Sequence, residues 1–336
     1  MPDRILLVRL GALGDLVHLM PALDALRRAK PDARITWVCE DRFAGLLRGH
    51  PQIDRLIEAP RRKGSWRAFL HELRSESYDT AVEFQGMLKG AWIVRASGAP
   101  RRIGYAPPLG KEGSHLWMTE TVAIPPTPEA EHHTRKALLL MAGLGVREEG
   151  AHPRFPRSAE AAAEAETALG PRRGDPRVVL WPASSPGTRY RRWEPDRYVA
   201  VAEGLSKDGC EVLVPEAPGD EGLAVRIVER LKGRARLLPF VPIPVLIEML
   251  TQVDLVLGGD SGPAHLACSL GTPTVMIFGA KDPARYAPWG GPLAALYHPV
   301  GCNPCRNTWC EHVTCLDRIT PAEALSAARA FLRGMA

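Results

Sequence analysis

The sequence lacks any apolar run that approaches the ~20 residues needed to cross a bilayer as a helix. Its N-terminus leads straight into a short apolar segment and lacks the features of a secretory signal peptide. It also lacks recognition-helix, zinc-finger and RNA-binding signatures, which argues against nucleic acid as a partner. Together these absences favour a cytoplasmic protein without a membrane-spanning segment.

Cysteine is scarce, and seven cysteines in 336 residues are too unevenly placed for a chain-wide disulfide framework. Four of them form a compact C-x2-C-x4-C-x4-C pattern near the C-terminus, at Cys302, Cys305, Cys310 and Cys315. Four thiols this close in a cytoplasmic chain suggest tetrahedral zinc or iron ligation, although the spacings are tighter than in common zinc fingers. A structural metal site and free or paired thiols both stay open.

The composition that is present, 45% hydrophobic and 24% charged residues, is typical of a soluble globular protein. A chain of 336 residues predicts two domains of about 150 residues each. Short apolar runs alternate with amphipathic segments, which predicts an α/β fold with parallel strands. The proline-containing stretch 147–177 marks a junction, so we expect domains at 1–155 and 156–320 and a C-terminal helix within 321–336 that packs back on the first domain. No sequence repeat relates the two halves, although they could share a fold.

The first candidate site follows the apolar run Arg4–Leu10. Gly11 and Gly14 make a tight turn, and Asp15 then stands at the start of a helix. This position lies just beyond the carboxyl end of a strand, where open α/β sheets bind ligands. Asp is also a preferred helix cap, so the spacing alone allows either a structural or a catalytic carboxylate.

Positive charge is concentrated between Pro60 and Lys111, where ten Lys or Arg face four acidic residues for a net charge of +6. These cations include two expected loop groups: Arg61, Arg62 and Lys63 in one, and Arg101 and Arg102 in another. Such a region suits a partner rich in phosphate or carboxylate, such as an acidic small molecule or a lipid head group. Solvated surface charges are the alternative.

A second polar loop leaves the end of the buried strand expected at Arg177–Trp181. Ser184 and Ser185 supply hydroxyls, and the candidate cations Arg189, Arg191 and Arg192 follow them. Hydroxyl and backbone donors next to a cation suit a diphosphate, whereas the plainer interpretation is an ordinary polar loop.

The segment Leu255–Gly279 reads as strand, glycine-rich turn, helix and strand, which is a βαβ unit of a parallel sheet. Glycines in the turn, Gly262 among them, allow backbone to approach a ligand, and the helix start makes an anion site. Asp260, Ser261 and His265 surround that turn. A common strand-to-helix turn with Asp260 as a cap is the alternative.

The amino-acid sequences of these segments resemble those of the ADP-heptose:lipopolysaccharide heptosyltransferases, glycosyltransferase family 9. The resemblance rests on RLGALGDLVHLMPAL, on Phe84–Lys89, on Ser184–Trp193 and on DSGPAHLA followed by GTPTVMIFGAKDP. It implies a GT-B fold of two Rossmann-like domains whose parallel sheets face an interdomain cleft. It also implies inverting transfer of heptose from ADP-heptose to the inner core (Kdo-lipid A) of lipopolysaccharide, with no cofactor required for catalysis.

The same resemblance implies roles for individual residues. Asp15 would be the general base, taking a proton from the acceptor hydroxyl. The donor would be bound by Ser184, Ser185, Arg191, Asp260, Ser261, Gly262 and His265, with Arg191 where the family has a lysine and Asp260 accepting hydrogen bonds from hydroxyls. The acceptor would be bound by Arg61, Arg62, Lys63, Gln85 and Lys89. The nucleotide would lie near Asp220 or Glu221, and His132 is expected to be a surface or capping histidine.

Three rival functions follow from other interpretations of the same features. The nearest is a glycosyltransferase of the same fold that uses another nucleotide sugar or a protein or glycan acceptor. A nucleotide-dependent oxidoreductase is disfavoured because GALGD lacks the third glycine of GxGxxG. A non-catalytic sugar-nucleotide-binding protein would tolerate loss of Asp15. For the heptosyltransferase, the basic region would also give peripheral contact with the inner membrane without an apolar anchor.

Overall fold

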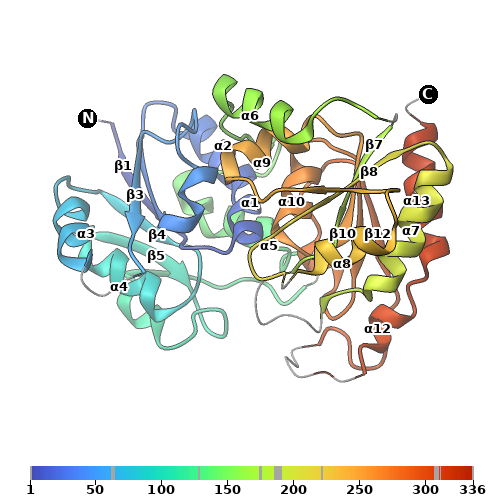
Figure 1. The fold of residues 1–336 in the computed structure, drawn as a ribbon. Coiled ribbons are helices and arrows are strands. Elements are labelled where there is room, and N and C mark those ends of the chain that lie inside the picture. The colour runs from blue at the N-terminus through green and yellow to red at the C-terminus, as the bar shows by residue number, and fades with distance from the viewer. Residues whose placement is uncertain are drawn as a thin grey trace. The chain divides into compact units, whose positions relative to one another are not determined.

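A computed structural model describes residues 2–61, 65–127, 129–173, 176–184, 191–220, 222–305, 310 and 312–334. The chain divides into two compact units, Met1–Pro156 and Arg157–Ala336. Each unit is built on a six-stranded sheet with helices packed against it (Figure 1). Within the described ranges no helix is long and apolar enough to cross a membrane.

The first sheet has the strand order β3-β2-β1-β4-β5-β6, and all its neighbouring strands are parallel. Its strands are β1 (Arg4–Val8), β2 (Arg34–Glu40), β3 (Arg55–Ala59), β4 (Thr80–Glu83), β5 (Arg101–Tyr105) and β6 (Glu120–Val122). The α-helices of this unit are α1 (Leu13–Val17), α2 (Met20–Ala29), α3 (Trp66–Leu73), α4 (Leu88–Ala96) and α5 (His133–Leu140). Shorter 3₁₀ helices are η1 (Asp41–Leu46), η3 (Ser114–Trp117) and η4 (Ala142–Leu144).

Strand β1 lies in the middle of the first core. Its residues from Ile5 to Val8 are at most 1% exposed, as expected for a parallel strand covered on both faces. Apolar side chains of β2, β3, β4, α3 and α4 pack with it in one cluster. The continuous apolar run therefore makes a central strand, and the turn that follows it opens at the edge of the sheet.

One local expectation for this unit is wrong, because Arg101 and Arg102 lie on strand β5 and not in a loop. Their charges are accommodated on the strand. Arg101 pairs with Glu120 of the neighbouring strand β6, at 2.8 Å between nitrogen and carboxylate oxygen. Arg102 donates to the carbonyl oxygens of Ala99 at 2.8 Å and Trp117 at 3.0 Å.

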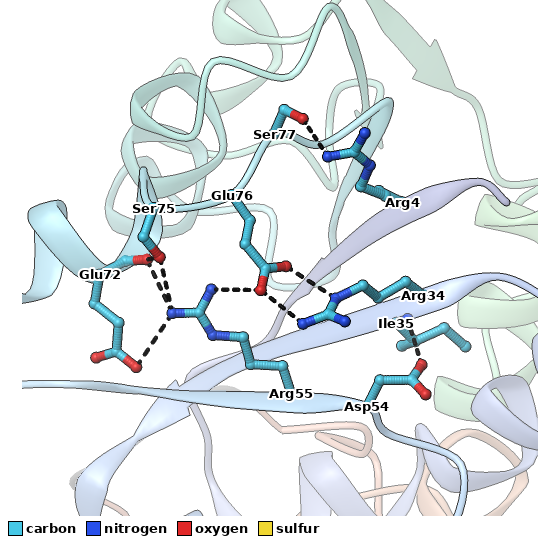
Figure 2. Close-up of polar contacts among 9 residues, drawn as sticks. All are labelled: Arg4, Arg34, Ile35, Asp54, Arg55, Glu72, Ser75, Glu76 and Ser77. Carbon is cyan, nitrogen blue, oxygen red and sulfur yellow. Dashed lines mark hydrogen bonds and ion pairs between the residues drawn. The ribbon is translucent and has the colours of Figure 1, made fainter. Parts of the chain in front are cut away.

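The amino-terminal edge of the first sheet is tied by ion pairs, drawn in Figure 2. The carboxylate of Glu76 points toward two guanidinium groups, 2.7 Å from Arg34 and 3.2 Å from Arg55. Asp54 accepts the backbone N–H of Ile35 at 2.7 Å. Exposed pairs of this kind contribute little individually, roughly 0–1 kcal/mol each. They therefore join strands and loops at an edge that carries none of the candidate site residues.

The second sheet has the strand order β12-β11-β10-β7-β8-β9, again with parallel neighbours. Its strands are β7 (Arg177–Trp181), β8 (Glu211–Pro215), β9 (Arg236–Leu238), β10 (Leu255–Gly259), β11 (Thr274–Phe278) and β12 (Leu293–Tyr297). Its helices are α6 (Ala159–Leu169), α7 (Pro195–Lys207), α8 (Leu223–Arg230), α9 (Ile243–Leu250), α10 (Gly262–Ser269), α11 (Pro283–Tyr286), α12 (Thr314–Asp317) and α13 (Pro321–Arg333).

The last helix, α13, belongs to the core of the second unit. Its buried residues Ala324 and Ala328 join the apolar cluster of that sheet. Close packing on α7 depends on Gly204, because a Cβ there would lie 2.5 Å from a methyl group of Leu325. The apolar side of α13 is thus used within the second unit, and its expected packing on the first domain stays a prediction. Its predicted start is confirmed, since Thr320 and Glu323 form a capping box.

The two sheets have the same topology although no sequence repeat relates them. Counted along each unit, both follow the order 3-2-1-4-5-6, which is that of the Rossmann fold. In such a sheet the strand order reverses between the first and the fourth strand. That point lies between β1 and β4 in the first unit and between β7 and β10 in the second.

Candidate active site

The candidate residues gather where the strand order reverses in each sheet. In the first unit the turn after β1 carries Asp15, and the segment after β4 carries Gln85 and Lys89. In the second unit Ser184 follows β7, and Asp260 and Ser261 follow β10. Ligands of open α/β sheets bind at this point, outside the carboxyl ends of the strands. Each unit therefore has one candidate site, built from two adjacent strand ends.

Asp15 sits in the first turn of α1 and is held by three groups. Its Oδ2 lies 2.6 Å from a guanidinium nitrogen of Arg9 and accepts the backbone N–H of Ala12 at 3.0 Å. Its Oδ1 lies 3.6 Å from Nδ1 of His133. The side chain thus caps the helix start and still leaves 32% of its area exposed. The structural and the catalytic interpretation of Asp15 are compatible, because one carboxylate can serve both.

Opposing effects act on the ionisation of Asp15. Burial raises the pKa of this carboxyl, but the Arg9 guanidinium, the contact with His133 and the Ala12 N–H outweigh it and hold the pKa well below its usual range. Burial also lowers the pKa of His133, to about 4, so that its imidazole is neutral at neutral pH. Asp15 is therefore an anion whose cationic partner is Arg9.

Arg9 and His133 were missed by the sequence analysis. Arg9 is the last polar residue before the GALGD turn, and it also donates to the carbonyl oxygen of Phe84 at 2.8 Å. His133 is adjacent to His132, whose Nδ1 accepts from the N–H of Thr134 at 3.2 Å. The prediction that His132 caps a helix is confirmed. The residue next to it, His133, contacts Asp15.

Glu83 ends strand β4 as a buried carboxylate with 1% exposure. It accepts the backbone N–H of Gln85 at 2.9 Å and that of Gly86 at 2.7 Å, which fixes the loop after the strand. Gly90 makes room for it, because a Cβ there would lie 2.2 Å from Oε1 of Glu83. Burial raises the pKa of Glu83 to about 7, against the lowering effect of the two amides and Arg9.

The residues expected to bind an acceptor differ in their surroundings. Lys89 pairs with Glu40 at 3.0 Å and lies over the ring of Trp66, 5.6 Å from its centroid. Gln85 is half-buried, with its Nε2 3.6 Å from the sulfur of Met87. Arg61 lines a hollow of about 650 Å³ together with Asp41, Pro60 and Ser65. Arg62 and Lys63 lie outside the described residues.

In the second unit, the loop after β7 is linked to the loop after β8. Ser184 Oγ accepts from Nε of Arg192 at 2.9 Å, and the same guanidinium donates to the carbonyl oxygen of Gly219 at 2.9 Å. Arg191 is half-buried and acts electrostatically on Asp260. Ser185 lies outside the described residues. Among the described residues, Arg192 therefore binds the predicted hydroxyl, and Arg191 lies toward the β10 turn.

Asp260 and His265 form a buried pair across the first turn of α10, with 3.0 Å between Oδ1 and Nε2. Lys281 Nζ lies 3.9 Å from the other oxygen, Oδ2. Burial raises the pKa of Asp260, but His265, Lys281 and Arg191 outweigh it and lower the pKa below its usual value. The site thus holds an ionised carboxylate among cations. Lys281, in the segment GAKDP after β11, was not predicted as a site residue.

Helix α10 presents its amino terminus beside this pair. Ser261 is its N-cap, and the hydroxyl is buried without a hydrogen-bond partner in the described structure. Gly258 lets β10 lie close to β7, since a Cβ there would be 2.8 Å from the carbonyl oxygen of Trp181. Gly262 begins the helix, so its N–H is among those that the helix leaves unpaired. Backbone donors, a hydroxyl and the helix dipole therefore converge as an anion requires.

Two further expectations concern the edges of this unit. Asp220 accepts the N–H of Gly222 at 2.8 Å and that of Ala217 at 3.4 Å, so its carboxylate shapes its own loop. Glu221 lies outside the described residues. In the described part of the C-terminal segment no three cysteines, or other possible ligands, form a metal-binding group. Cys315 is buried, whereas Cys302 is exposed.

Comparison with known proteins places these features in context. A model of glycosyltransferase family 9 (heptosyltransferase) matches residues 66–314. The chain is 26% identical over 322 residues to lipopolysaccharide heptosyltransferase 1 of Pseudomonas aeruginosa, covering 92% of this chain and 88% of that protein. Its fold is similar to glycosyl transferase family 9 from Veillonella parvula, with a TM-score of 0.84, 20% identity and coverage of 99% and 97%. It is also similar to E. coli heptosyltransferase WaaC with ADP, with a TM-score of 0.75, 22% identity and coverage of 99% and 100%.

Proposed function

The chain belongs to glycosyltransferase family 9, and from this membership we propose that it transfers heptose from ADP-heptose to the inner core (Kdo-lipid A) of lipopolysaccharide. The expected α/β class with two Rossmann-like units is confirmed, and so is the expected glycosyltransferase. The rival with another nucleotide sugar or a protein acceptor is not favoured, because the curated relatives are named lipopolysaccharide heptosyltransferases.

One observation supports the proposal most: the points where the strand order reverses carry different functional groups in the two units. The first holds an ionised carboxylate, Asp15, and the second holds an anion site at the start of α10. An inverting transfer from a nucleotide diphosphate sugar needs these two elements and no second catalytic carboxylate, since the diphosphate leaves with little protonation. A hydrolase of the usual kind would need a second one as acid.

In the proposed reaction Asp15 accepts the proton of the acceptor hydroxyl as the hydroxyl oxygen attacks C1 of the heptose. The bond between C1 and the diphosphate oxygen breaks, and ADP leaves from the opposite face. Arg9 keeps Asp15 ionised, which leaves the carboxylate ready but lowers its basicity. The contribution of Asp15 to catalysis then depends on its fixed position, which is held by Arg9 and the Ala12 N–H.

For the donor, we assign the diphosphate to Ser184, Ser185, Arg191, Ser261 and Gly262. Hydroxyl and backbone donors, the guanidinium and the start of α10 would stabilise the negative charge of the leaving group without a cofactor. Asp260 and His265 would bind sugar hydroxyls, because a carboxylate repels a phosphate. Lys281 joins this set, since it stands 3.9 Å from Asp260.

For the acceptor, we assign Arg61, Arg62, Lys63, Gln85 and Lys89 to its phosphate and carboxylate groups. When the acceptor binds, Lys89 would leave its ion pair with Glu40 and pair with an anionic group of the acceptor. Because the acceptor is a lipid, the proposal places the enzyme in the cytoplasm, at the inner face of the inner membrane.

We also propose a structural metal, because the sequence spacing of four cysteines suits metal ligation. They are Cys302, Cys305, Cys310 and Cys315. Cys302 and Cys310 lie near enough to Cys315 to raise its pKa further, after burial, the larger cause. Elemental analysis of the purified chain decides this point. One zinc or iron per chain that is lost in Cys302→Ser supports the site, and a metal-free chain of unchanged activity contradicts it.

The test of the function pairs a donor screen with two variants. ADP-heptose should raise the melting temperature more than other nucleotide sugars do, because only a bound ligand stabilises by mass action. Asp15→Asn should lower turnover by roughly 10²–10⁴-fold while ADP affinity stays unchanged. Ser261→Ala should weaken ADP binding by about 1–3 kcal/mol. Near wild-type turnover in Asp15→Asn would show that this residue is only a helix cap.

A further inference from the structure

The first unit presents an apolar patch on its surface, formed by Leu88, Leu116 and Trp117. These side chains are 43%, 77% and 37% exposed, which makes Leu116 the most exposed large apolar residue in the described chain. Leu88 begins α4, and the other two end the 3₁₀ helix η3. The two elements are joined, because the Leu88 N–H donates to Glu112 at 3.1 Å and the Lys111 N–H donates to the Gly86 carbonyl at 2.8 Å.

The patch is held rigidly by residues that point inward. Ser114 is 2% exposed, and Met118 packs so closely on Gly104 that a Cβ there would lie 2.8 Å from its side chain. Arg102 donates to the carbonyl oxygen of Trp117 at 3.0 Å. Leu116 and Trp117 therefore project from an anchored turn, so their exposure is a property of the fold and not of a frayed end.

Three exposed cations lie on or next to the elements that carry these apolar side chains, and one of them, Lys89, pairs with Glu40. Lys111 is exposed next to Glu112, whose carboxylate accepts the Leu88 N–H. Lys89 and Arg95 are exposed on α4, whose first residue is Leu88. A projecting apolar tip with a cationic border is the signature of a surface that lies in the interface of an anionic bilayer. Tryptophan is one of the residues that are enriched at this interface.

We propose that Leu88, Leu116, Trp117 and Lys111 dock the first unit onto an anionic lipid surface. The inference deepens the proposed function, on which it rests, by naming how the enzyme meets the membrane that carries its lipid acceptor. It also replaces the expectation that basic residues alone would make this contact. Apolar burial supplies affinity that salt does not screen, and Lys111 supplies selectivity for anionic lipid.

The test is cosedimentation of the full chain with vesicles of phosphatidylcholine alone or with about one third phosphatidylglycerol. Leu116→Ser combined with Trp117→Ser should lower binding to anionic vesicles about 10–100-fold, since two apolar side chains stay in water. Lys111→Glu should lower binding to the anionic vesicles about 5–30-fold and leave the weak binding to neutral vesicles unchanged. Phe240→Ser is the matched control, because Phe240 is 58% exposed on the second unit and should not matter.

A second measurement separates docking from catalysis. With an acceptor freed of its acyl chains, the Leu116→Ser/Trp117→Ser variant should turn over like the wild type. If neither the wild type nor the variants transfer heptose but the vesicle binding differs as expected, the proposed function fails and the docking surface stands. Equal vesicle binding by wild type and variants overturns the docking surface. So does a wild-type dimer in sedimentation velocity that the double variant loses, because a second copy would then cover the patch.

Discussion

Replacing Arg9 by methionine tests how the ionisation of Asp15 is maintained. In the wild type a guanidinium nitrogen lies 2.6 Å from the carboxylate, and the Arg9 side chain is only 12% exposed. His133 does not substitute for that charge, because its pKa of about 4 leaves it neutral. Without Arg9, the burial that raises the pKa of Asp15 is opposed by the Ala12 amide and by the contact with His133. The carboxyl should then bind its proton more tightly than it does in the wild type.

The size of the effect follows from the contact that is lost. A hydrogen bond to a charged group contributes about 1.5–3 kcal/mol, which corresponds to roughly 10–100-fold in proton affinity. The exposure of Asp15, 32%, favours the lower end. We therefore expect the acid limb of the kcat/KM profile, where protonation of Asp15 lowers activity, to lie about one pH unit higher in Arg9→Met than in the wild type.

Two variants make this result interpretable. Arg9→Lys keeps the cation and should restore the wild-type position of the acid limb, even if the altered geometry lowers kcat at every pH. Arg34→Met is the control, because Arg34 also forms an ion pair, with Glu76 at the amino-terminal edge of the same sheet (Figure 2). The pH profile of this variant should match that of the wild type. An acid limb of Arg9→Met that coincides with that of the wild type would refute the reasoning, because the ionisation of Asp15 would then not depend on Arg9.

Three other results are expected. Glu83→Gln should remove a pH dependence of stability. The raised pKa of about 7 means that the contribution of Glu83 is present at low pH and lost as pH rises through 7, by up to about 3 kcal/mol, which urea unfolding at about pH 5 and about pH 8 measures. Gly90→Ala should displace Glu83 and cost about 1–3 kcal/mol of stability. It should also raise the KM for the acceptor but not for the donor. An unchanged acceptor KM would contradict the link between Glu83 and the loop. Asp260→Asn should weaken binding of ADP-heptose about 10-fold and leave ADP binding unchanged in calorimetry, and equal losses for both would assign Asp260 to the diphosphate.

The sequence predicted those features that depend on local order along the chain. The strand Arg177–Trp181 has the expected bounds, because a continuous apolar run in a parallel sheet is buried on both faces. The turns that carry Asp15 and Asp260 also lie where predicted, because each follows such a strand. Local patterns of this kind fix which residues stand at the carboxyl edge of a sheet.

Contacts between distant segments could not be predicted in this way. His133 reaches Asp15 from a helix far along the chain, and no spacing reveals the pairing. The count of positive charges treated every cation as available, yet Glu40 neutralises Lys89 and Glu120 neutralises Arg101. Glu83 was overlooked because a carboxylate at a strand end is usually solvated, whereas here Gly90 and two amides give it a buried place.

The separate cores of the two units determine how this protein unfolds. Each sheet has its own apolar cluster, so we expect heat or denaturant to unfold two cooperative blocks, and the melting temperature that ADP-heptose raises is that of the second block. A ligand stabilises only the block that binds it. ADP should therefore delay the melting of the block 157–336 and leave the other transition in place. A calorimetric trace with two resolved transitions then reports which half of the chain holds the nucleotide, without any substitution.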